Sequence, residues 1–518
     1  MAPIPAAATR EGGRLRGAWF LVALLFLAAL LLRLFRIGAE SLWLDEAYSW
    51  RLASDGPLSI LEGARGNRHT PPLYYFLLHY WMAFGDSEWA LRSLSAVLGA
   101  AATPLVYLLG KSLRGERAGL LAAGASAVSP FLVYYGQEAR GYTLLLALVL
   151  LQALFARRFL LAGRGRDAIG FAAAAVLALY THYYAAFLLV GWNALLLFDL
   201  RRTPRALGIW IACQIAIGLA YLPWMLRLLD GGFGGGQTFR RFLFLQLPYT
   251  FFRFNAGYGL LPLSPEAKTS WTDFLVRNIP WIAAFCVVFG ILVWRGARRL
   301  ASDPAVLRFL VVPLAVTCLL SIAVSLRSNL ISERYLLAIF PFYLLIAVEG
   351  ASGGRIAKIV APAAAALLVA ALGMHYFNPR AGKTEWREAA ALVERNERPG
   401  DVVLAVPSFV DLPFVYYHRQ GAPVRGVRAP EPFAPEAFER ETRAFAEAPR
   451  IWAVVSHTPD AEAILRVLAE GRETVLRERF PKENAVTVAL FERGSAAAAN
   501  GAGPRGGGGA ERTIGGKP

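Results

Sequence analysis

The chain has 518 residues, of which 56% are hydrophobic and 18% are charged, and its formal net charge is +17. This composition is too apolar for a soluble enzyme of this length and is typical of a protein with several membrane-spanning helices. The positive charge does not indicate nucleic-acid binding, because the lysines and arginines stand in short runs between apolar segments. Cys213, Cys286 and Cys318 lie within apolar stretches, which excludes a disulfide framework and a thiolate metal cluster.

Apolar runs of about 20 residues, the length of a spanning helix, recur along the first three quarters of the chain, and we expect about eleven such helices. The first runs from about Trp19 to Ile37 and follows Arg10, Arg14 and Arg16, which predicts a cytoplasmic N-terminus. No small-residue cleavage site follows this run, so we expect a retained anchor and not a signal peptide.

The charges of the connecting loops give an independent prediction of orientation. Alternating the spans places five basic connections in the cytoplasm: Lys111–Arg117, Arg157–Asp167, Asp199–Arg205, Trp294–Arg299 and Glu349–Lys358. The short connections Gly136–Tyr142 and Thr181–Tyr184 then face outward and are not dominated by Lys or Arg, as the positive-inside rule requires. Two longer outer loops are expected at residues 38–90 and 229–278.

Beyond the last span, the composition becomes that of a small α/β domain. Amphipathic patterns predict helices, and β-branched apolar runs predict strands, in this order: helix Thr384–Asn396, strand Asp401–Phe409, strand Arg450–His457, helix Ala461–Gly471 and strand Val486–Gly494. Residues 495–518 are rich in Gly and Ala without periodicity and are predicted to be disordered.

The predicted organisation is therefore a cytoplasmic segment 1–17, a membrane domain 18–378, an extracytoplasmic α/β domain 379–494 and a disordered tail. The expected fold class is an all-α polytopic membrane protein with a small C-terminal extracytoplasmic α/β domain. A cell inner or plasma membrane location, multi-pass, follows from this organisation.

The stretch SLWLDEAYSW, Ser41–Trp50, follows the first span and places two carboxylates, Asp45 and Glu46, among aromatic and leucine residues. Near apolar side chains a carboxylate is desolvated, which raises its pKa and makes it a better base for a hydroxyl proton. The alternative is an acid pair in the first turn of a helix, which the helix dipole favours. Because adjacent helical side chains point about 100° apart, we do not expect Asp45 and Glu46 to share one role.

Further polar residues collect on the predicted outer face. Gln137, Glu138 and Arg140 stand in a tight turn between two spans, where ionisable residues indicate function, although a self-neutralising Glu138–Arg140 pair is the alternative. His69 precedes a proline pair and is a candidate for metal or substrate contact, or a structural histidine. His182 lies at another outer turn, with aromatic-belt packing as its alternative role.

Arg334 and Tyr335 stand just outside a later span. The Arg334 guanidinium could extend to any lipid headgroup, or it could bind one particular phosphate through two parallel hydrogen bonds.

The order of these motifs resembles a known family. An acid pair after the first span, then PPLYY, QEARGY and ERYLL followed by a proline, resemble the GT-C glycosyltransferases that depend on polyprenyl phosphate. Protein O-mannosyltransferases, aminoarabinose transferases of lipid A and lipopolysaccharide galacturonosyltransferases belong to this group. The resemblance covers about Arg14–Tyr376. It implies a sugar donor on a polyprenyl phosphate and inverting transfer to an envelope glycan, lipid or protein hydroxyl outside the cytoplasm.

By match of position, the resemblance implies Asp45 as the base and Glu138 as the second acid. Some relatives place an acid before PPL and hold a divalent metal there, whereas this sequence has His69 and Thr70. A metal bound by Asp45, His69 and Glu138 and a site without metal therefore both remain open, and no other cofactor is implied. The candidate catalytic set is Asp45, Glu46 and Glu138, and the candidate substrate-binding set is His69, Gln137, Arg140, His182, Arg334 and Tyr335.

The chemistry of these residues agrees with that implication. Displacing a phosphate from an anomeric carbon needs a base, which Asp45 can supply, and a cation for the leaving phosphate, which Arg140 or Arg334 can supply. No Walker loop or dinucleotide fingerprint accompanies a strand, so an ATP-driven pump is not indicated. The alternative function is a transporter or flippase of lipid-linked sugars, whose ionisable residues would be expected near the bilayer midplane.

Overall fold

The structure is a computed structural model that describes residues 6–66, 70–200, 203–231, 243–260, 271–326, 331–378 and 382–493. The predicted tail 495–518 and His69 lie outside these residues. The chain divides into two compact units, Met1–Arg387 with Pro481–Ala485, and Glu388–Phe480 with Val486–Pro518. Their elements differ, because the first unit is helical and the second contains a sheet.

The described residues of the first unit form helices of very different lengths. In chain order they are α1 (Ala6–Leu34), α2 (Leu44–Ser54), α3 (Pro57–Gly66), α4 (Leu73–Trp81), the 3₁₀ helix η1 (Met82–Phe84), α5 (Glu88–Arg114), α6 (Glu116–Val128), α7 (Pro130–Gly136), α8 (Tyr142–Ala162), α9 (Gly165–Leu179), α10 (Ala185–Leu200), α11 (Pro204–Gly231), α12 (Leu243–Ala256), α14 (Trp271–Leu300), α15 (Pro304–Ser325), the 3₁₀ helix η3 (Leu336–Ile339), α16 (Phe340–Gly350) and α17 (Gly354–Phe377).

Seven helices within the described residues are long and apolar enough to cross a membrane, namely α1, α5, α8, α11, α14, α15 and α17. The bent pair of α6 and α7 makes an eighth span if it is counted as one, and shorter apolar helices occur at Ala185–Leu197 and Leu336–Gly350. A mostly helical, multi-pass membrane protein is therefore confirmed. The number of about eleven spans stays a prediction.

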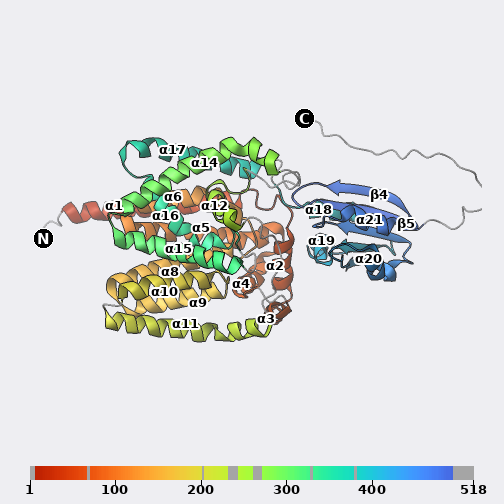
Figure 1. Cartoon of the computed structure of the whole chain (residues 1–518), viewed down its shortest axis with the longest axis horizontal. Coiled ribbons are helices and arrows are strands. Elements are labelled where there is room, and N and C mark those ends of the chain that lie inside the picture. Colours follow the sequence, from red (N-terminus) through yellow and green to blue (C-terminus); the bar gives the residue numbers. More distant parts are fainter. Residues whose placement is uncertain are drawn as a thin grey trace, which may run out of the picture. The chain divides into compact units, whose positions relative to one another are not determined.

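The long helices run side by side, and the short helices α2, α3 and α4 gather at one end of this bundle (Figure 1). The predicted outer loop 38–90 is thus largely helical. In the loop predicted at 229–278, the described residues belong to the end of α11, to α12 and the residues that follow it, and to the start of α14.

The break between α6 and α7 positions the segment that follows α7. Pro130 begins α7 and has no backbone N–H, so it cannot continue the hydrogen bonding of α6, and the two helices meet at 58°. The buried side chain of Arg33 reaches this break from α1 and donates to the carbonyl oxygen of Ala127 at 3.4 Å. Its stem passes Gly136, where a Cβ would lie 2.7 Å from the Arg33 Cδ. Gln137 and Glu138 follow directly.

Helices α14 and α16 pack with their backbones in close contact at two glycines, Gly296 and Gly350. This close packing gives a first prediction. A Cβ at Gly296 would overlap the carbonyl oxygen of Ile346, which is a backbone atom and cannot move aside. We expect Gly296→Ala to lower the free energy of unfolding by about 1–3 kcal/mol, measured as a lower midpoint of thermal unfolding in detergent. Gly290→Ala in the same helix is the control, because a Cβ there meets nothing within 4 Å. Equal midpoints for the two variants would contradict the close packing.

The second unit is a five-stranded sheet in the order β2-β1-β3-β5-β4. Its elements are α18 (Trp386–Asn396), which begins within the first unit, β1 (Val402–Val406), η4 (Ser408–Val410), α19 (Asp411–Tyr417), β2 (Val424–Gly426), α20 (Pro435–Thr442), η5 (Arg443–Phe445), β3 (Arg450–Val455), α21 (Ala461–Ala469), β4 (Arg472–Phe480) and β5 (Val486–Arg493). β1 pairs in parallel with β2 and β3, and β5 pairs antiparallel with β3 and β4.

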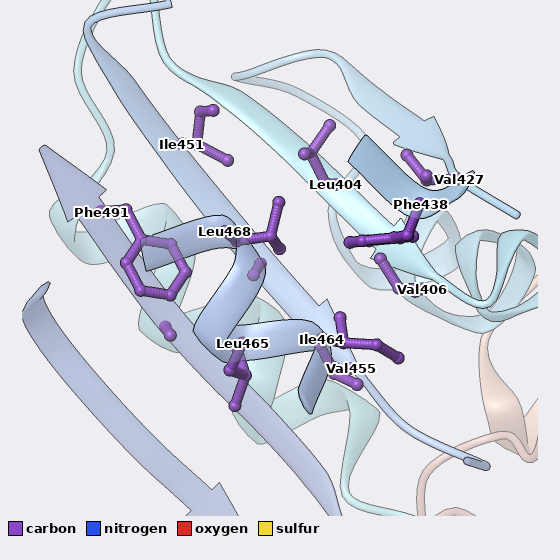
Figure 2. Close-up of a cluster of buried hydrophobic side chains, with 12 residues drawn as sticks. Leu404, Val406, Val427, Phe438, Ile451, Val455, Ile464, Leu465, Leu468 and Phe491 are labelled. Carbon is purple, nitrogen blue, oxygen red and sulfur yellow. The ribbon is translucent and has the colours of Figure 1, made fainter. Parts of the chain in front are cut away.

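The core of this unit lies between the sheet and its helices. Ile464, Leu465 and Leu468 of α21 pack on residues of β1, β3 and β5, together with Phe438 of α20 (Figure 2). A small C-terminal α/β unit is therefore confirmed, whereas its extracytoplasmic position stays a prediction.

Candidate active site

Five of the residues predicted from the sequence lie together at the end of the bundle that carries α2 and α4. Asp45 belongs to the first turn of α2, and its Oδ2 lies 3.0 Å from Nη1 of Arg334 and 3.9 Å from Nη2 of Arg140. The ring of Tyr335 lies 5.1 Å from that of His182, between centroids. Helix α2 and three separate connections of the chain therefore meet in this region.

The immediate surroundings of Asp45 differ from those expected. The sequence predicted an apolar, desolvating setting, but the Asp45 side chain is 29% exposed and paired with guanidinium groups. The apolar neighbours in SLWLDEAYSW gave no sign of this, because both arginines come from distant segments. Asp45 is thus held between two cations.

Arg140 is fixed by several groups at once. Its Nη1 donates to the phenolic oxygen of Tyr75 at 3.0 Å and to the backbone carbonyl of Asp45 at 3.3 Å. Burial lowers the pKa of Arg140, but the nearby Tyr75 and Asp45 outweigh burial and raise that pKa well above its ordinary value. Arg140 therefore carries its charge in a nearly enclosed place.

Arg334 lies over aromatic rings, with its guanidinium carbon 5.1 Å from the ring centre of Tyr335 and 5.9 Å from that of Trp43. Such contacts add a cation–π attraction to the ion pair. Burial lowers the pKa of Arg334, while Tyr142, Tyr335 and Asp45 raise it, and the net shift is upward. The aromatic rings therefore hold this cation in place without neutralising it.

His182 is neutral beside these two cations. Its pKa is lowered to about 3, first by burial and then by the charges of Arg140 and Arg334. Nδ1 accepts a hydrogen bond from the backbone N–H of Tyr184 at 3.2 Å, so we assign the ring proton to Nε2. His182 can donate a hydrogen bond to a substrate oxygen but cannot add a charge at neutral pH.

Glu46 differs from its neighbour Asp45, because its carboxylate is fully buried and occupied by donors. Arg92 donates to both of its oxygens at 2.7 Å, Lys383 donates through Nζ at 2.8 Å, and the backbone N–H of Ala139 donates at 2.9 Å. Burial raises the pKa of Glu46, but Arg92 and Lys383 outweigh burial and lower the pKa to about 2. Glu46 is therefore ionised and without a free oxygen to accept a proton.

Arg92 connects this buried pair to the segment between α1 and α2. It donates to the backbone carbonyls of Ile37, Glu40 and Ser41, each at 2.8 Å. The Glu46–Arg92 pair therefore fixes the entry to α2, and with it the position of Asp45.

Glu138 lines a cavity of about 770 Å³ that also reaches Arg334. Its side chain is buried, and its Oε1 has no hydrogen-bond partner within the described part of the chain. Burial raises the pKa of Glu138 to about 7, against the opposing charge of Lys383. The cavity wall also includes Trp43, Arg253, Glu333 and Lys383.

Comparisons with known proteins agree with this architecture. The family described as dolichyl-phosphate-mannose-protein mannosyltransferase matches residues 69–225, less than half of the chain. ArnT from Cupriavidus metallidurans in the apo state is 15% identical, with a TM-score of 0.56, over 91% of this chain and 98% of ArnT. The same protein bound to undecaprenyl phosphate is 16% identical, with a TM-score of 0.54, over 93% and 99%. The Archaeoglobus fulgidus oligosaccharyltransferase in the apo form is 14% identical, with a TM-score of 0.52, over 88% of this chain and 73% of that one.

The chain shares its fold with these solved glycosyltransferases. No curated protein matches its sequence. The GT-C resemblance expected from the order of the motifs is confirmed, and at identities this low it is the fold that is shared.

Gln137 and His69 are two further residues predicted from the sequence. The Gln137 amide donates to the backbone carbonyls of Arg33 at 3.0 Å and Phe35 at 2.8 Å, and its oxygen lies 2.8 Å from Nε2 of His375. It therefore ties the ends of α1 and α17 together, and substrate binding by Gln137 stays a prediction. His69 lies outside the described residues.

The described residues do not fit a divalent metal. They contain no group of three or more His, Cys, Asp or Glu side chains placed to hold one. Asp45 and Glu138 have Arg334 and Lys383 beside them, and these cations oppose a metal ion. Because His69 lies outside the described residues, a metal bound by Asp45, His69 and Glu138 stays a prediction.

Several residues of the cavity wall were not predicted from the sequence. The phenol of Tyr258 donates to Glu333 at 2.7 Å and lies 2.6 Å from the hydroxyl oxygen of Tyr135. The buried Arg253 lies over the ring of Tyr258 at 4.9 Å. A signal was present, because Arg92 and Arg253 are single charges inside apolar runs. Lys383 gave none, since it stands in a polar connection.

Proposed function

We propose that this chain is an integral-membrane glycosyltransferase that moves a sugar from a polyprenyl-phosphate donor to a hydroxyl of an envelope glycan, lipid or protein. The observation that carries this proposal is the Asp45 carboxylate held between Arg140 and Arg334, of which Arg334 lines a cavity of about 770 Å³. The fold supports it, because ArnT has been solved with undecaprenyl phosphate bound.

The reaction is a single displacement with inversion at the anomeric carbon. The acceptor hydroxyl attacks that carbon while its proton passes to the Asp45 carboxylate, and a new carbon–oxygen bond forms. The bond between the anomeric carbon and the phosphate oxygen breaks, and its electron pair leaves with the phosphate. Arg140 and Arg334 stabilise the charge that develops on that phosphate. The products are the glycosylated acceptor and free polyprenyl phosphate.

The ion pairs of Asp45 fit this sequence of events. While it is paired with two cations, a carboxylate is a weak base. A donor phosphate competes for the same guanidinium groups, and its arrival releases Asp45 to act as a base only when the donor is in place. Deprotonation of the acceptor is in this way coupled to donor binding.

The role of Arg334 can be tested by changing its shape without its charge. We expect Arg334→Lys to reduce kcat/KM for the donor by about tenfold or more, because a lysine cannot make two parallel hydrogen bonds to a phosphate. Arg334→Ala should be worse. If Arg334 only extends to lipid headgroups, Lys should work as well as Arg. The measurement is the initial transfer rate against donor concentration, and equal kinetics for all three proteins would remove Arg334 from the site.

The orientation belongs to the proposal and has its own test. We propose that the end of the bundle carrying Asp45 and the C-terminal α/β unit are extracytoplasmic. In a background with the exposed Cys286 replaced by Ser, a cysteine at the exposed Thr474 should react with an impermeant thiol reagent in intact cells. A cysteine at Ser112, at the other end of α5, should react only after lysis. The reverse pattern would contradict the orientation.

The function itself is tested in a deletion strain by mass spectrometry of lipid-linked sugars and envelope glycans. We expect one polyprenyl-phosphate sugar to accumulate and one sugar to be lost from an envelope component. Complementation with the intact gene should reverse both changes, whereas Asp45→Asn should reverse neither. Restoration by Asp45→Asn would instead favour a flippase, which needs no base.

A further inference from the structure

Lys383 and Glu138 form an incomplete pair in the cavity wall. Nζ of Lys383 lies 3.7 Å from Oε1 of Glu138, which is too far for a hydrogen bond. That oxygen has no donor within the described residues, although the Glu138 side chain is buried. A buried carboxylate oxygen that has lost water without gaining a donor is unfavourable. A bound group that donates to Glu138 and accepts from Lys383 would therefore complete the pair.

Lys383 has hydrogen-bonding capacity left for such a group. An ammonium has three N–H donors, and Lys383 gives one of them to Glu46 at 2.8 Å. Glu46 already receives donors from Arg92 and Ala139, so it does not need more from Lys383. The Lys383 side chain is 13% exposed and lines the cavity, which places its remaining donors within reach of a bound molecule.

The signs of the two charges restrict what the third group can be. A hydroxyl both donates and accepts, so it can donate to Oε1 of Glu138 and accept from Nζ of Lys383. A carboxylate at the same point could accept from Lys383 but would face the like charge of Glu138, and an ammonium could donate to Glu138 but would face the like charge of Lys383. A neutral hydroxyl satisfies both groups without this repulsion. A hydrogen in place of the hydroxyl would leave both groups unsatisfied.

We propose that Glu138 and Lys383 form a subsite that binds one hydroxyl of the donor sugar and thereby selects an uncharged sugar. The inference rests on the proposed function and adds the class of sugar to it. Glu138, the predicted second acid, acts here in recognition of the sugar. Lys383, from the connection between α17 and α18, is a residue of the substrate site.

The experiment uses the purified full-length protein and defined donors. Undecaprenyl phosphate carries D-glucose, D-mannose or D-arabinose, and each sugar is also supplied in its monodeoxy, amino and, for the hexoses, uronic acid forms. The readout is kcat/KM for release of undecaprenyl phosphate in the presence of an envelope extract as acceptor. We expect transfer from an uncharged sugar, and a loss of about tenfold to hundredfold in kcat/KM when one particular hydroxyl is removed.

Variants of the pair should change the preference in opposite directions. Lys383→Met should reduce kcat/KM for the hydroxyl donor about tenfold to hundredfold, with little further effect on the deoxy donor, and should improve the relative rate with the amino sugar. Glu138→Gln should improve the relative rate with the uronic acid. The matched controls are Lys111→Met and Glu116→Gln, because that pair, 3.6 Å apart, lies outside the cavity wall. Neither control should alter the preference.

The outcomes separate the two proposals. Transfer of charged and uncharged sugars at equal rates, or a loss in Lys383→Met that is the same for hydroxyl and deoxy donors, overturns the subsite and leaves the glycosyltransferase standing. The second result would mean that Lys383 only supports Glu46. Release of undecaprenyl phosphate from no donor overturns the proposed function and the subsite with it.

Discussion

Asp45→Asn should lower the rate of sugar transfer by about 100-fold to 10,000-fold, the range that general base catalysis contributes. Asparagine has nearly the same size, so it removes the proton acceptor but little packing. The side chain is 29% exposed, and loss of such a partly exposed ion pair costs the fold little. The initial rate with purified protein is the measurement, and the midpoint of thermal unfolding confirms that the variant is folded.

Asp55→Asn provides the matched control for this substitution. Asp55 follows the last residue of α2, and its carboxylate pairs with Arg51 at 3.5 Å. An Asp-to-Asn change there should leave the transfer rate unchanged, because Asp55 has no contact with Arg140 or Arg334 among the described residues. Near-normal transfer by Asp45→Asn would rule out the base role and direct attention to Glu138, whose pKa is raised to about 7.

The fold was predictable to the extent that it depends on hydrophobic length and periodicity. Apolar runs gave the long helices, because crossing a membrane requires about 20 apolar residues whatever their neighbours are. The break at Ser129–Pro130 was harder to see, since α6 and α7 together form one apolar run. The bounds of short helices such as α2 and α3 were not predictable in this way, because short helices owe their stability to tertiary packing.

Strand β4 was not predictable from its hydrophobic pattern. Its sequence, RETVLRERF, is dominated by charged residues, and most of its side chains are exposed. It lies at the edge of the sheet beside β5, where charged side chains protect against association with other strands. Period-2 hydrophobicity, the usual signal of a strand, is weak in such a segment.

The candidate site was predictable as a set of residues on one face but not as a set of pairs. Sidedness alone brought Asp45, Arg140, His182 and Arg334 together. The different roles of Asp45 and Glu46 depend on partners that lie far away in the sequence, such as Arg92, 46 residues from Glu46. No local pattern could tell which of two adjacent acids is buried.

Breaking the Glu46–Arg92 pair should have the largest effect on stability. We expect Glu46→Gln to lower the free energy of unfolding by about 3–5 kcal/mol, because truncating one partner leaves a buried charge unpaired. The amide NH₂ of a glutamine would also face the N–H donors of Arg92 or Lys383. Arg92→Met should be at least as harmful, since three backbone carbonyls lose their donor too. Glu116→Gln, at an exposed pair, should change stability by less than about 0.5 kcal/mol.

The pH dependence distinguishes Glu46 from Glu138 because the two pKa values are shifted in opposite directions from 4.5. Glu46 binds protons less readily when folded, so its stabilisation is complete above about pH 4.5 and is lost as the pH falls toward 2. Glu138 binds protons more readily when folded, so its ionisation destabilises the fold progressively from about pH 4.5 to 7. Thermal unfolding in detergent at pH 4, 7 and 8 should therefore show Glu138→Gln gaining on the wild type as the pH rises, while Glu46→Gln stays far below it at pH 7 and 8. Parallel curves for both variants would mean that the two carboxylates share one environment, and the division between a structural acid and an acid of the cavity would be wrong.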